Sequence, residues 1–417
     1  MKKKDVVVIG GGVIGLSCAY YLQEAGCQVT IIDQGTMEDG CSYGNAGMVT
    51  PSHFVPLAAP GMIQKGMMWM FNPESPFYIK PRFDLDLFSW AWKFYRAASP
   101  QRVERAAPVL RDVSLLSKQL FKEFAEQAAF QFAFEERGIL MMYKTDKAGE
   151  EEAHNARMAG KLGIEANTLS LAAVKELEPN INLDILGAVH YPGDAHLSPA
   201  LFLKALKANL IENGTNILPR TTVKQLELKG NKIQKIITDQ GDFTADEYIL
   251  ATGSWSPILA KKLQLKIPIQ AGKGYSFTLA KPMAKLNTPA ILMEAKIAVT
   301  PMEEQLRFAG TMEIAGLDLS INPRRVKGII KSIPAYLPDF AGQRYEDLKI
   351  WKGLRPCSPD GLPFVGRAQR YTNLSIAAGH AMLGLTLGPA TGKLIAESLL
   401  GQPTSCAIDL LDPERYD

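Results

Sequence analysis

Cysteine is scarce in this chain of 417 residues, and its five cysteines lack the paired spacing of a metal site. Their odd number argues against a disulfide framework, so we expect reduced thiols and a cytoplasmic protein. No apolar run reaches the roughly 18 residues that a membrane-spanning helix needs. The net charge is only +3, which gives no sign of nucleic-acid binding. Internal repeats and low-complexity segments are also missing, so a globular protein is expected.

The composition fits that class, with 47% apolar and 21% charged residues, and the length allows two domains. Lys2–Lys4 before an apolar run imitates the start of a secretory signal. The glycines from residue 10 to 12 interrupt that run, so we expect no cleaved signal.

The most informative segment runs from residue 6 to residue 33. Val6–Ile9 is short and β-branched, which predicts a strand buried on both faces of a parallel sheet. The turn G-G-G-V-I-G follows at residues 10–15, then a helix is predicted over 16–25 and a second strand over 28–32. This order of strand, glycine turn, helix and strand is typical of a site for an adenine dinucleotide.

Each part of that segment has a physical role. Gly10 permits the tight turn, Gly12 lets the backbone approach a pyrophosphate, and Gly15 lets the helix pack on the strand. The amides and dipole of the helix N-terminus face the phosphates. Asp33 ends the second strand, where its carboxylate can accept hydrogen bonds from ribose hydroxyls. The segment alone does not distinguish FAD from NAD.

Further along the chain, a strand over 188–191, a helix over 200–213 and a strand over 248–250 predict a second part of the same nucleotide domain. Ala251–Gly253 then follows at the carboxyl end of a strand, where open α/β sheets bind ligands. Between these elements, the segments 221–228, 232–238 and 242–244 predict a meander. Longer alternating strands over 275–279, 297–301 and 305–310 predict an antiparallel sheet in a second domain.

Trp351–Gly366 is crowded with prolines and glycines around a single arginine, Arg355, which predicts a rigid loop that aims one guanidinium. Arginine holds a carboxylate bidentately and so fixes its position and orientation. The alternative is a structural ion pair between Arg355 and Asp360 of the same loop.

Three other segments are candidates for the site. Gly379–Pro389 predicts a glycine-rich turn from strand to helix, whose amides could stabilise negative charge on a reduced flavin; plain helix capping is the alternative, and His380 is expected to be structural. Ser42–Met48 is small and polar enough to lie against a flat ring. Tyr275 begins a strand of the second domain and is either catalytic or a core residue.

Taken together, these residues resemble the D-amino acid oxidase-like superfamily of FAD enzymes, and most closely the bacterial D-amino acid dehydrogenase (small-subunit) family. The marks of the resemblance are the glycine turn and the following motifs: G-N-A-G at 44–47, A-P-G at 59–61, W-M-F at 69–71, K-G-Y-S at 273–276, G-L-R-P at 353–356, P-D-G at 359–361 and G-H-x-x-L-G at 379–384. It covers nearly the whole chain.

The resemblance implies a discontinuous Rossmann-type FAD-binding domain (1–54, 187–256 and 345–417) and an α+β substrate-binding domain with a large mixed or antiparallel sheet (55–186 and 257–344), in a D-amino acid oxidase/glycine oxidase-like α/β fold. FAD is expected to be non-covalent, because Cys357 is misplaced for a tether. The residues expected to contact it are Gly10, Gly12, Val13, Ile14, Gly15, Asp33, Gln34, Ser42, Asn45, Ala46, Gly47, Met48, Val223, Thr252, Gly253, Gly379, Leu383, Gly384 and Thr386.

The activity that follows is oxidative deamination of a D-amino acid to a 2-oxo acid and ammonia, by hydride transfer from Cα to flavin N5. Arg355 would hold the substrate carboxylate, with Tyr275 as a second catalytic residue and a quinone-type molecule as electron acceptor. No acidic residue or histidine in these motifs stands out as an obligatory base. Three alternatives remain: a secondary-amine enzyme acting on sarcosine, proline or hydroxyproline; a glycine oxidase, which Met382 disfavours because related glycine oxidases carry an arginine there; and a non-catalytic FAD-binding subunit.

The segment 62–95 is unusually rich in methionine and tryptophan. Core packing is the default interpretation. The alternative is an apolar patch that touches the inner face of the cytoplasmic membrane and admits a quinone, because Trp69 with Lys65 and Trp92 with Lys93 suit an interface between apolar and wet surroundings.

Overall fold

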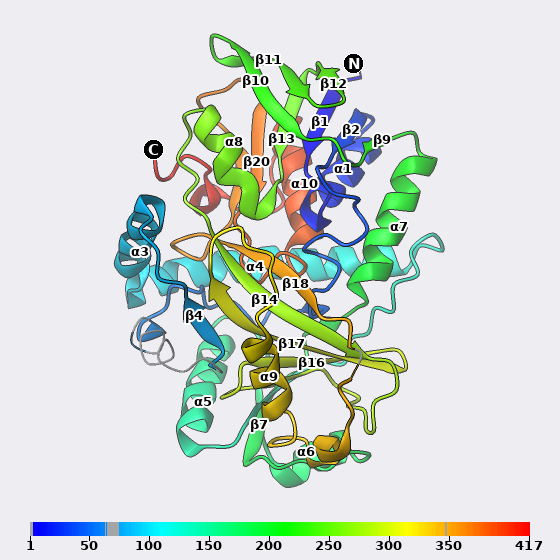
Figure 1. Ribbon diagram of the computed structural model, residues 1–417, viewed down its shortest axis with the longest axis vertical. Helices are drawn as coiled ribbons and strands as arrows, with labels where there is room; N and C mark the ends of the chain where they lie inside the picture. Colours follow the sequence, from blue (N-terminus) through cyan, green and yellow to red (C-terminus); the bar gives the residue numbers. More distant parts are fainter. Residues whose placement is uncertain (1–2, 63, 65–74, 347) are drawn as a thin grey trace.

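Two large sheets dominate the computed structural model, which describes residues 3–62, 64, 75–346 and 348–417. A six-stranded sheet lies in the upper half of Figure 1 and a nine-stranded sheet in the lower half. The long helix α4 (Pro100–Ala125) crosses the view between them. This mixed α/β architecture confirms the expected fold class.

The six-stranded sheet has its first strand near the centre, as in dinucleotide-binding folds. All neighbouring strands are parallel except one antiparallel pair at an edge. In order across the sheet they are β19 (Phe364–Arg367), β20 (Leu374–Ala378), β13 (Glu247–Leu250), β1 (Asp5–Ile9), β2 (Gln28–Ile32) and β9 (Asn216–Leu218).

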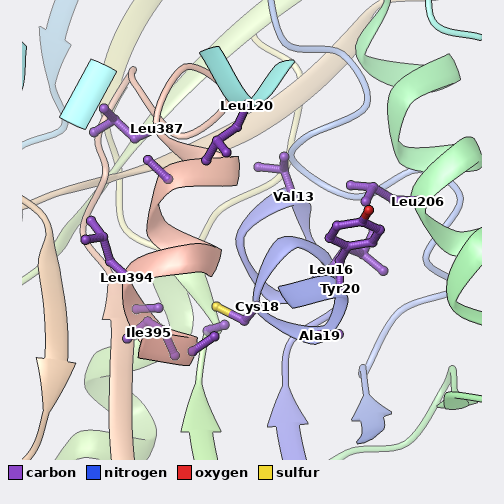
Figure 2. Packing of buried hydrophobic residues seen from close by; sticks show 14 of the residues in the cluster. Val13, Leu16, Cys18, Ala19, Tyr20, Leu120, Leu206, Leu387, Leu394 and Ile395 are labelled. Atoms are coloured by element: carbon purple, nitrogen blue, oxygen red, sulfur yellow. The ribbon is translucent and has the colours of Figure 1, made fainter. Parts of the chain in front are cut away.

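Both faces of this sheet are covered, which explains its nearly continuous apolar strands. Side chains alternate along β1: Val6 and Val8 enter one core, and Val7 and Ile9 enter another. The first core packs helices against one face, and Figure 2 shows Leu16, Leu120, Leu206 and Leu394 meeting there from four helices. Those helices are α1 (Val13–Glu24), α4, α7 (Pro199–Glu212) and α10 (Gly388–Leu399). The second core packs against α8 (Ser256–Lys262) and the meander of β10 (Val223–Lys229), β11 (Lys232–Thr238) and β12 (Gly241–Phe243).

The nine-stranded sheet is mixed, because its mostly antiparallel ladder contains two parallel pairs. Its order is β18 (Trp351–Cys357), β14 (Gln270–Leu279), β17 (Gln305–Ile314), β16 (Ile297–Met302), β15 (Ala290–Leu292), β5 (Ile139–Tyr143), β7 (Gly187–Tyr191) and β6 (Asn167–Ser170), with β4 (Phe77–Ile79) paired to β17. The remaining elements are α3 (Leu85–Ala97), α5 (Asp146–Lys161), α6 (Leu171–Leu177), α9 (Pro323–Ser332), the pair β3 (Met48–Val49) and β8 (Ala195–His196), and three short 3₁₀ turns at Gly253–Trp255, Pro338–Gly342 and Asp409–Leu411.

Strand pairing corrects two of the expected domain boundaries. The strand β7 was assigned to the FAD-binding segment 187–256, but it hydrogen-bonds to β5 and β6 in the nine-stranded sheet. The strand β18 was assigned to the segment 345–417, yet it pairs with β14 of that same sheet. Local sequence identifies a strand but not its partner, and the partners here come from distant parts of the chain.

Trp351–Cys357 also differs in kind from its prediction, because it is a regular strand and not a loop. The meander and the strand β13 lie close to where the pattern placed them. Of the aromatic segment 62–95, residues 63 and 65–74, including Trp69, lie outside the described residues. No helix of the described ranges is long and apolar enough to cross a membrane.

Candidate active site

A cavity of about 1310 Å³ lies where the glycine turn of β1 faces the nine-stranded sheet. Typical small-molecule pockets measure roughly 300–1,000 Å³, so this cavity has room for a molecule of dinucleotide size and a small partner. Its wall combines the ends of β1, β2 and β13 with β14, β17 and β18 and with part of α3. The glycine turn predicted to bind the cofactor and the strand that carries Arg355 therefore line the same cavity.

The glycine turn is shaped by two close approaches. Gly10 adopts φ +110°, and a Cβ atom on it would lie 2.4 Å from the carbonyl oxygen of Ala251. A Cβ atom on Gly15 would lie 1.8 Å from the carbonyl oxygen of Gly10, so only glycine lets α1 begin this close to the turn. The amides of Gly12 and Ile14 donate to no acceptor in the described residues. They leave a positively polarised helix terminus facing the cavity, which suits a phosphate.

Asp33 stands beside this turn, as expected. Its Oδ2 accepts a hydrogen bond from the Gly11 amide at 2.6 Å, and its Oδ1 accepts one from the Gly35 amide at 2.7 Å. Each oxygen keeps a further lone pair for a hydroxyl donor. The carboxylate thus fixes the turn and remains able to bind a ribose.

The cavity wall includes all the predicted cofactor contacts except Gly15, Gly47 and Gly379. Each of these three glycines lies against neighbouring atoms that leave no room for a side chain. A Cβ atom on Gly47 would meet the carbonyl oxygen of Leu197 at 2.4 Å, and one on Gly379 would meet the ring of Phe364 at 2.7 Å. The binding roles of the remaining residues stay predictions.

The segment 41–48 is clamped onto the nine-stranded sheet. Ser42 Oγ accepts a hydrogen bond from the Val13 amide, and Ser276 Oγ donates to the Gly44 carbonyl at 2.8 Å. The Trp351 ring lies so close over Gly44 that a Cβ atom there would approach it to 2.0 Å. This loop is therefore a rigid wall of the cavity.

Arg307 of β17 is a clamp that the sequence analysis missed. Its Nη1 donates to the carbonyl oxygens of Asn45 at 2.7 Å and Tyr43 at 3.3 Å, and its Nε donates to Thr278. Burial lowers the pKa of this guanidinium to about 10. Nothing in the sequence near Arg307 signals that it holds this loop, because the two loop carbonyls that it binds lie more than 260 positions earlier.

The turn after β20 also lines the cavity, through residues 380–386. Thr386 Oγ1 donates to the Met48 carbonyl at 3.2 Å and accepts from the Thr50 amide, so it joins this turn to the loop. The helix α10 begins at Gly388, within the segment predicted as a turn from strand to helix. His380 is buried and bonded to Thr391, and burial lowers its pKa to about 3, which supports the structural interpretation.

Arg355 reaches the cavity from β18. Its Nη1 donates to the Thr311 carbonyl at 2.7 Å, and its guanidinium lies over Gly274, where a Cβ atom would collide with it at 2.1 Å. No carboxylate of the described residues pairs with it. Asp360, the alternative partner expected for Arg355, instead accepts hydrogen bonds from Nε and Nη2 of Arg415, at 2.8 and 3.0 Å. Arg355 is thus a half-buried cation in a cavity, available for an anion, although burial lowers its pKa.

Tyr275 is buried and borders the cavity, and its catalytic role stays a prediction. It also packs in the cluster that includes Phe277 and Ile329 of α9. The hydroxyl contacts Glu313 at 3.3 Å and accepts from the Asn322 amide at 3.1 Å. Both partners border a separate, smaller depression.

A histidine in the cavity wall was also missed. His53 follows the clamped loop, and its Nδ1 lies 3.2 Å from Ser52 Oγ, which donates in turn to the buried Asp194. The only sequence signal was the string T-P-S-H at 50–53, which carries no recognised meaning without Asp194 beside it.

These features define a dinucleotide-dependent enzyme, and the chain belongs to the FAD dependent oxidoreductase family, whose sequence model matches residues 5–398. It is similar to the D-amino acid dehydrogenase of Granulibacter bethesdensis (30% identical over 406 residues, 95% of this chain and 96% of that protein) and to that of Helicobacter pylori (31% over 395 residues, 94% of each). Among solved structures it is similar to glycine oxidase from Geobacillus kaustophilus (TM-score 0.80, 22% identical, 100% of both chains) and L-proline dehydrogenase from P. horikoshii (TM-score 0.77, 20% identical, 99% of this chain and 98% of that one). The likeness to these structures concerns the fold.

FAD fits the residues present. The free amides at the start of α1 face the cavity, the Asp33 carboxylate stands at the end of β2, and the clamped loop offers a flat wall. The chain is therefore an FAD-dependent oxidoreductase with its site in this cavity.

Proposed function

We propose that this protein is a D-amino acid dehydrogenase, which oxidises the Cα–N bond of a D-amino acid to an imine that water hydrolyses to a 2-oxo acid and ammonia. FAD, when bound, accepts the hydride from Cα. The similarity to D-amino acid dehydrogenases over nearly the whole chain supports the substrate class.

The observation that carries the proposal is the state of Arg355. A cationic side chain that borders a cavity and has no acidic partner in the described residues is poised for an anionic ligand. Its acceptor, the Thr311 carbonyl, uses one N–H and holds the planar group in place, so other donors remain for a substrate carboxylate. Fixing the carboxylate fixes the direction of the Cα–H bond, and orientation is a large part of the rate.

The cofactor is proposed to be held without a covalent bond. Cys357 is fully buried outside the cavity wall, and burial raises its pKa to about 12. Cys41 does border the cavity, but its Sγ accepts the Leu354 amide and burial raises its pKa also. Neither thiol is activated as the nucleophile that a thioether tether requires.

A quinone-type acceptor and a membrane contact extend the proposal, and α3 supports both. Its inner face carries Trp90 and Phe94, which line the cavity. Its outer face is a patch of Leu85, Phe88, Trp92 and Tyr95, each more than half exposed, and Tyr95 also borders the cavity. We call these four residues the α3 patch. Apolar side chains normally turn inward, so a cluster of this kind marks a contact surface.

The position of the α3 patch suits a lipid surface. Figure 1 places α3 at the edge of the molecule, and Lys93 and Arg96 lie on the same helix. Aromatic and basic side chains together are typical of helices that lie in a membrane interface. A quinone in the bilayer would then be one helix thickness from the cavity. We therefore place the protein in the cytoplasm, at the inner face of the cytoplasmic membrane.

Anaerobic mixing with a panel of amines tests the proposal. Bleaching of the flavin absorbance by D-alanine and not by L-alanine is expected. Bleaching by sarcosine or proline alone would instead indicate a secondary-amine enzyme, and bleaching by glycine alone a glycine oxidase. No bleaching by any member of the panel would indicate an FAD-binding subunit without turnover.

A further inference from the structure

Three side chains from two distant segments form a hydrogen-bonded chain at the wall of the cavity. Asp194, in the turn between β7 and β8, is fully buried. Its Oδ1 accepts the Ser52 amide at 3.1 Å, and its Oδ2 accepts the Ser52 hydroxyl at 2.5 Å. The same hydroxyl oxygen lies 3.2 Å from Nδ1 of His53, which lines the cavity.

When Asp194 is ionised, the directions of these bonds select one tautomer of the imidazole. Ser52 has one hydroxyl proton, and donating it to Asp194 leaves only the oxygen lone pairs for His53. With Asp194 ionised, Nδ1 of His53 carries the proton and donates it to Ser52, so that Nε2 is left as the basic nitrogen. Nε2 bonds to no group in the described ranges, and it lies on the ring edge opposite Ser52.

We propose that Nε2 of His53 accepts a proton from the ammonium group of the bound amino acid, with Ser52 and Asp194 as positioning residues. The inference rests on the proposed function, because it needs an amine substrate. In this step one N–H bond of the ammonium breaks and an Nε2–H bond forms. The step is a proton transfer, so no atom changes its oxidation state. The substrate becomes a neutral amine whose lone pair can assist the departure of hydride from Cα to FAD.

The surroundings keep the His53 imidazole neutral and so available as a proton acceptor. Burial chiefly lowers the pKa of His53 to about 4, and Lys296, which also lines the cavity, lowers it further. Burial raises the pKa of Asp194 to about 7, against its bonds to Ser52 and the charge of Lys118 on α4. An imidazolium formed at His53 would gain from the nearby Asp194 carboxylate, since opposite charges in a buried site attract strongly.

A purely structural role is the competing explanation, and the pH dependence of flavin reduction separates the two. The experiment measures the anaerobic reduction rate with D-alanine from pH 6 to pH 10 in the FAD-loaded protein. In His53→Gln the rate at pH 7 is expected to fall about 100-fold. It should then recover toward the wild-type rate at high pH, where the amine is already neutral in solution. A structural loss would lower the rate equally at all pH values.

His154→Gln is the matched control, because His154 is exposed on α5 and distant from the cavity wall. It should leave the whole profile unchanged. A His53→Gln rate within about threefold of wild type at pH 7, or a uniform loss at every pH, overturns the proposal.

The tautomer offers a readout that does not depend on turnover. In protein labelled with ¹⁵N-histidine, His53 should show a protonated Nδ1 and an unprotonated Nε2 at pH 7, with assignment from the spectrum of His53→Gln. Ser52→Ala should remove this preference. A proton on Nε2 in the wild type contradicts the hydrogen-bond chain. If wild-type flavin is not bleached by any amine, the proposed function fails as well; bleaching with an unchanged His53→Gln profile overturns the role of His53 alone.

Discussion

At the residue scale, the partner of Asp360 bears on the role proposed for Arg355. Arg415 holds Asp360 in a bidentate pair, which leaves Arg355 free at the cavity wall. The sequence placed Arg355 and Asp360 five positions apart and left their pairing open. Arg415 could not have been assigned, because it lies 55 positions from Asp360 and is brought there by the folding of the C-terminal segment.

Substitution of Arg355 tests its role directly. Arg355→Ala should retain FAD but lower kcat/KM by at least about tenfold, since a charge-assisted bidentate contact contributes about 1.5–3 kcal/mol. Arg355→Lys should recover only part of the loss, because an ammonium cannot bind both carboxylate oxygens in the same plane. Steady-state kinetics with an artificial dye as acceptor measure both variants; unchanged constants in Arg355→Ala would remove the residue from the site.

The Asp360–Arg415 pair makes a prediction about stability and pH. Burial alone would raise the pKa of Asp360, but the charge and hydrogen bonds of Arg415 outweigh it and lower the pKa. The stabilisation is therefore present above the unfolded pKa of about 3.9 and is lost as the pH falls through the lower folded value. Arg415→Ala should destabilise the protein at pH 7 by about 3–5 kcal/mol, because it strands a buried charge.

Thermal denaturation of wild type and Arg415→Ala between pH 7 and pH 3 measures this effect. The gap in Tm should narrow below about pH 4, where Asp360 of the unfolded chain becomes protonated, and should go on narrowing as the pH falls through the lower folded pKa. Arg370→Ala, at an exposed arginine nearby, should show a small effect at every pH. A gap that is constant across the whole range would contradict the assignment.

At the element scale, the sequence predicted what short-range patterns determine. The strand, glycine turn and helix from β1 to α1 were predicted because every signal lies within 28 residues of one run. The sequence of β18 predicts a loop, because Gly353 and Pro356 are poor strand formers and the ladder with β14 comes only from tertiary pairing. The sequence does not single out His53, because the residue that orients it through Ser52 is Asp194, which lies 142 positions from Ser52.

The helix α3 carries the prediction at this scale. Phe88→Glu with Trp92→Glu places two charges on the α3 patch while leaving the inner residues Trp90 and Phe94 intact. The double variant should lose binding to anionic vesicles and the reduction of vesicle-bound quinone, yet keep dye-linked activity. Ile211→Glu is the matched control, because Ile211 is equally exposed on α7, away from the α3 patch.

Vesicle sedimentation and the two activity assays check this prediction. Full quinone reduction by the double variant would contradict the membrane contact. A parallel loss of quinone-linked and dye-linked activity, with a lowered Tm, would mean that the α3 patch is needed for folding.

At the scale of the whole molecule, the site exists only because two sheets are brought together. The six-stranded sheet supplies the glycine turn and Asp33, and the nine-stranded sheet supplies Arg355 and the clamps on the loop. The chain crosses between the sheets several times, and the expected domain segments placed β7 and β18 apart from the nine-stranded sheet in which both pair. The cavity itself could not have been derived from sequence, because its shape depends on how these layers pack.

The central claim is that this cavity oxidises an amine whose carboxylate is held by Arg355. The most direct measurement compares anaerobic flavin bleaching by a D-amino acid with bleaching by the corresponding amine that lacks the carboxylate, in wild type and in Arg355→Met. The account predicts that the wild type reacts with the amino acid at least about tenfold more efficiently than with the amine. It also predicts that the substitution removes most of that difference. Equal bleaching of the wild type by both compounds, or a preference that survives in Arg355→Met, would contradict it.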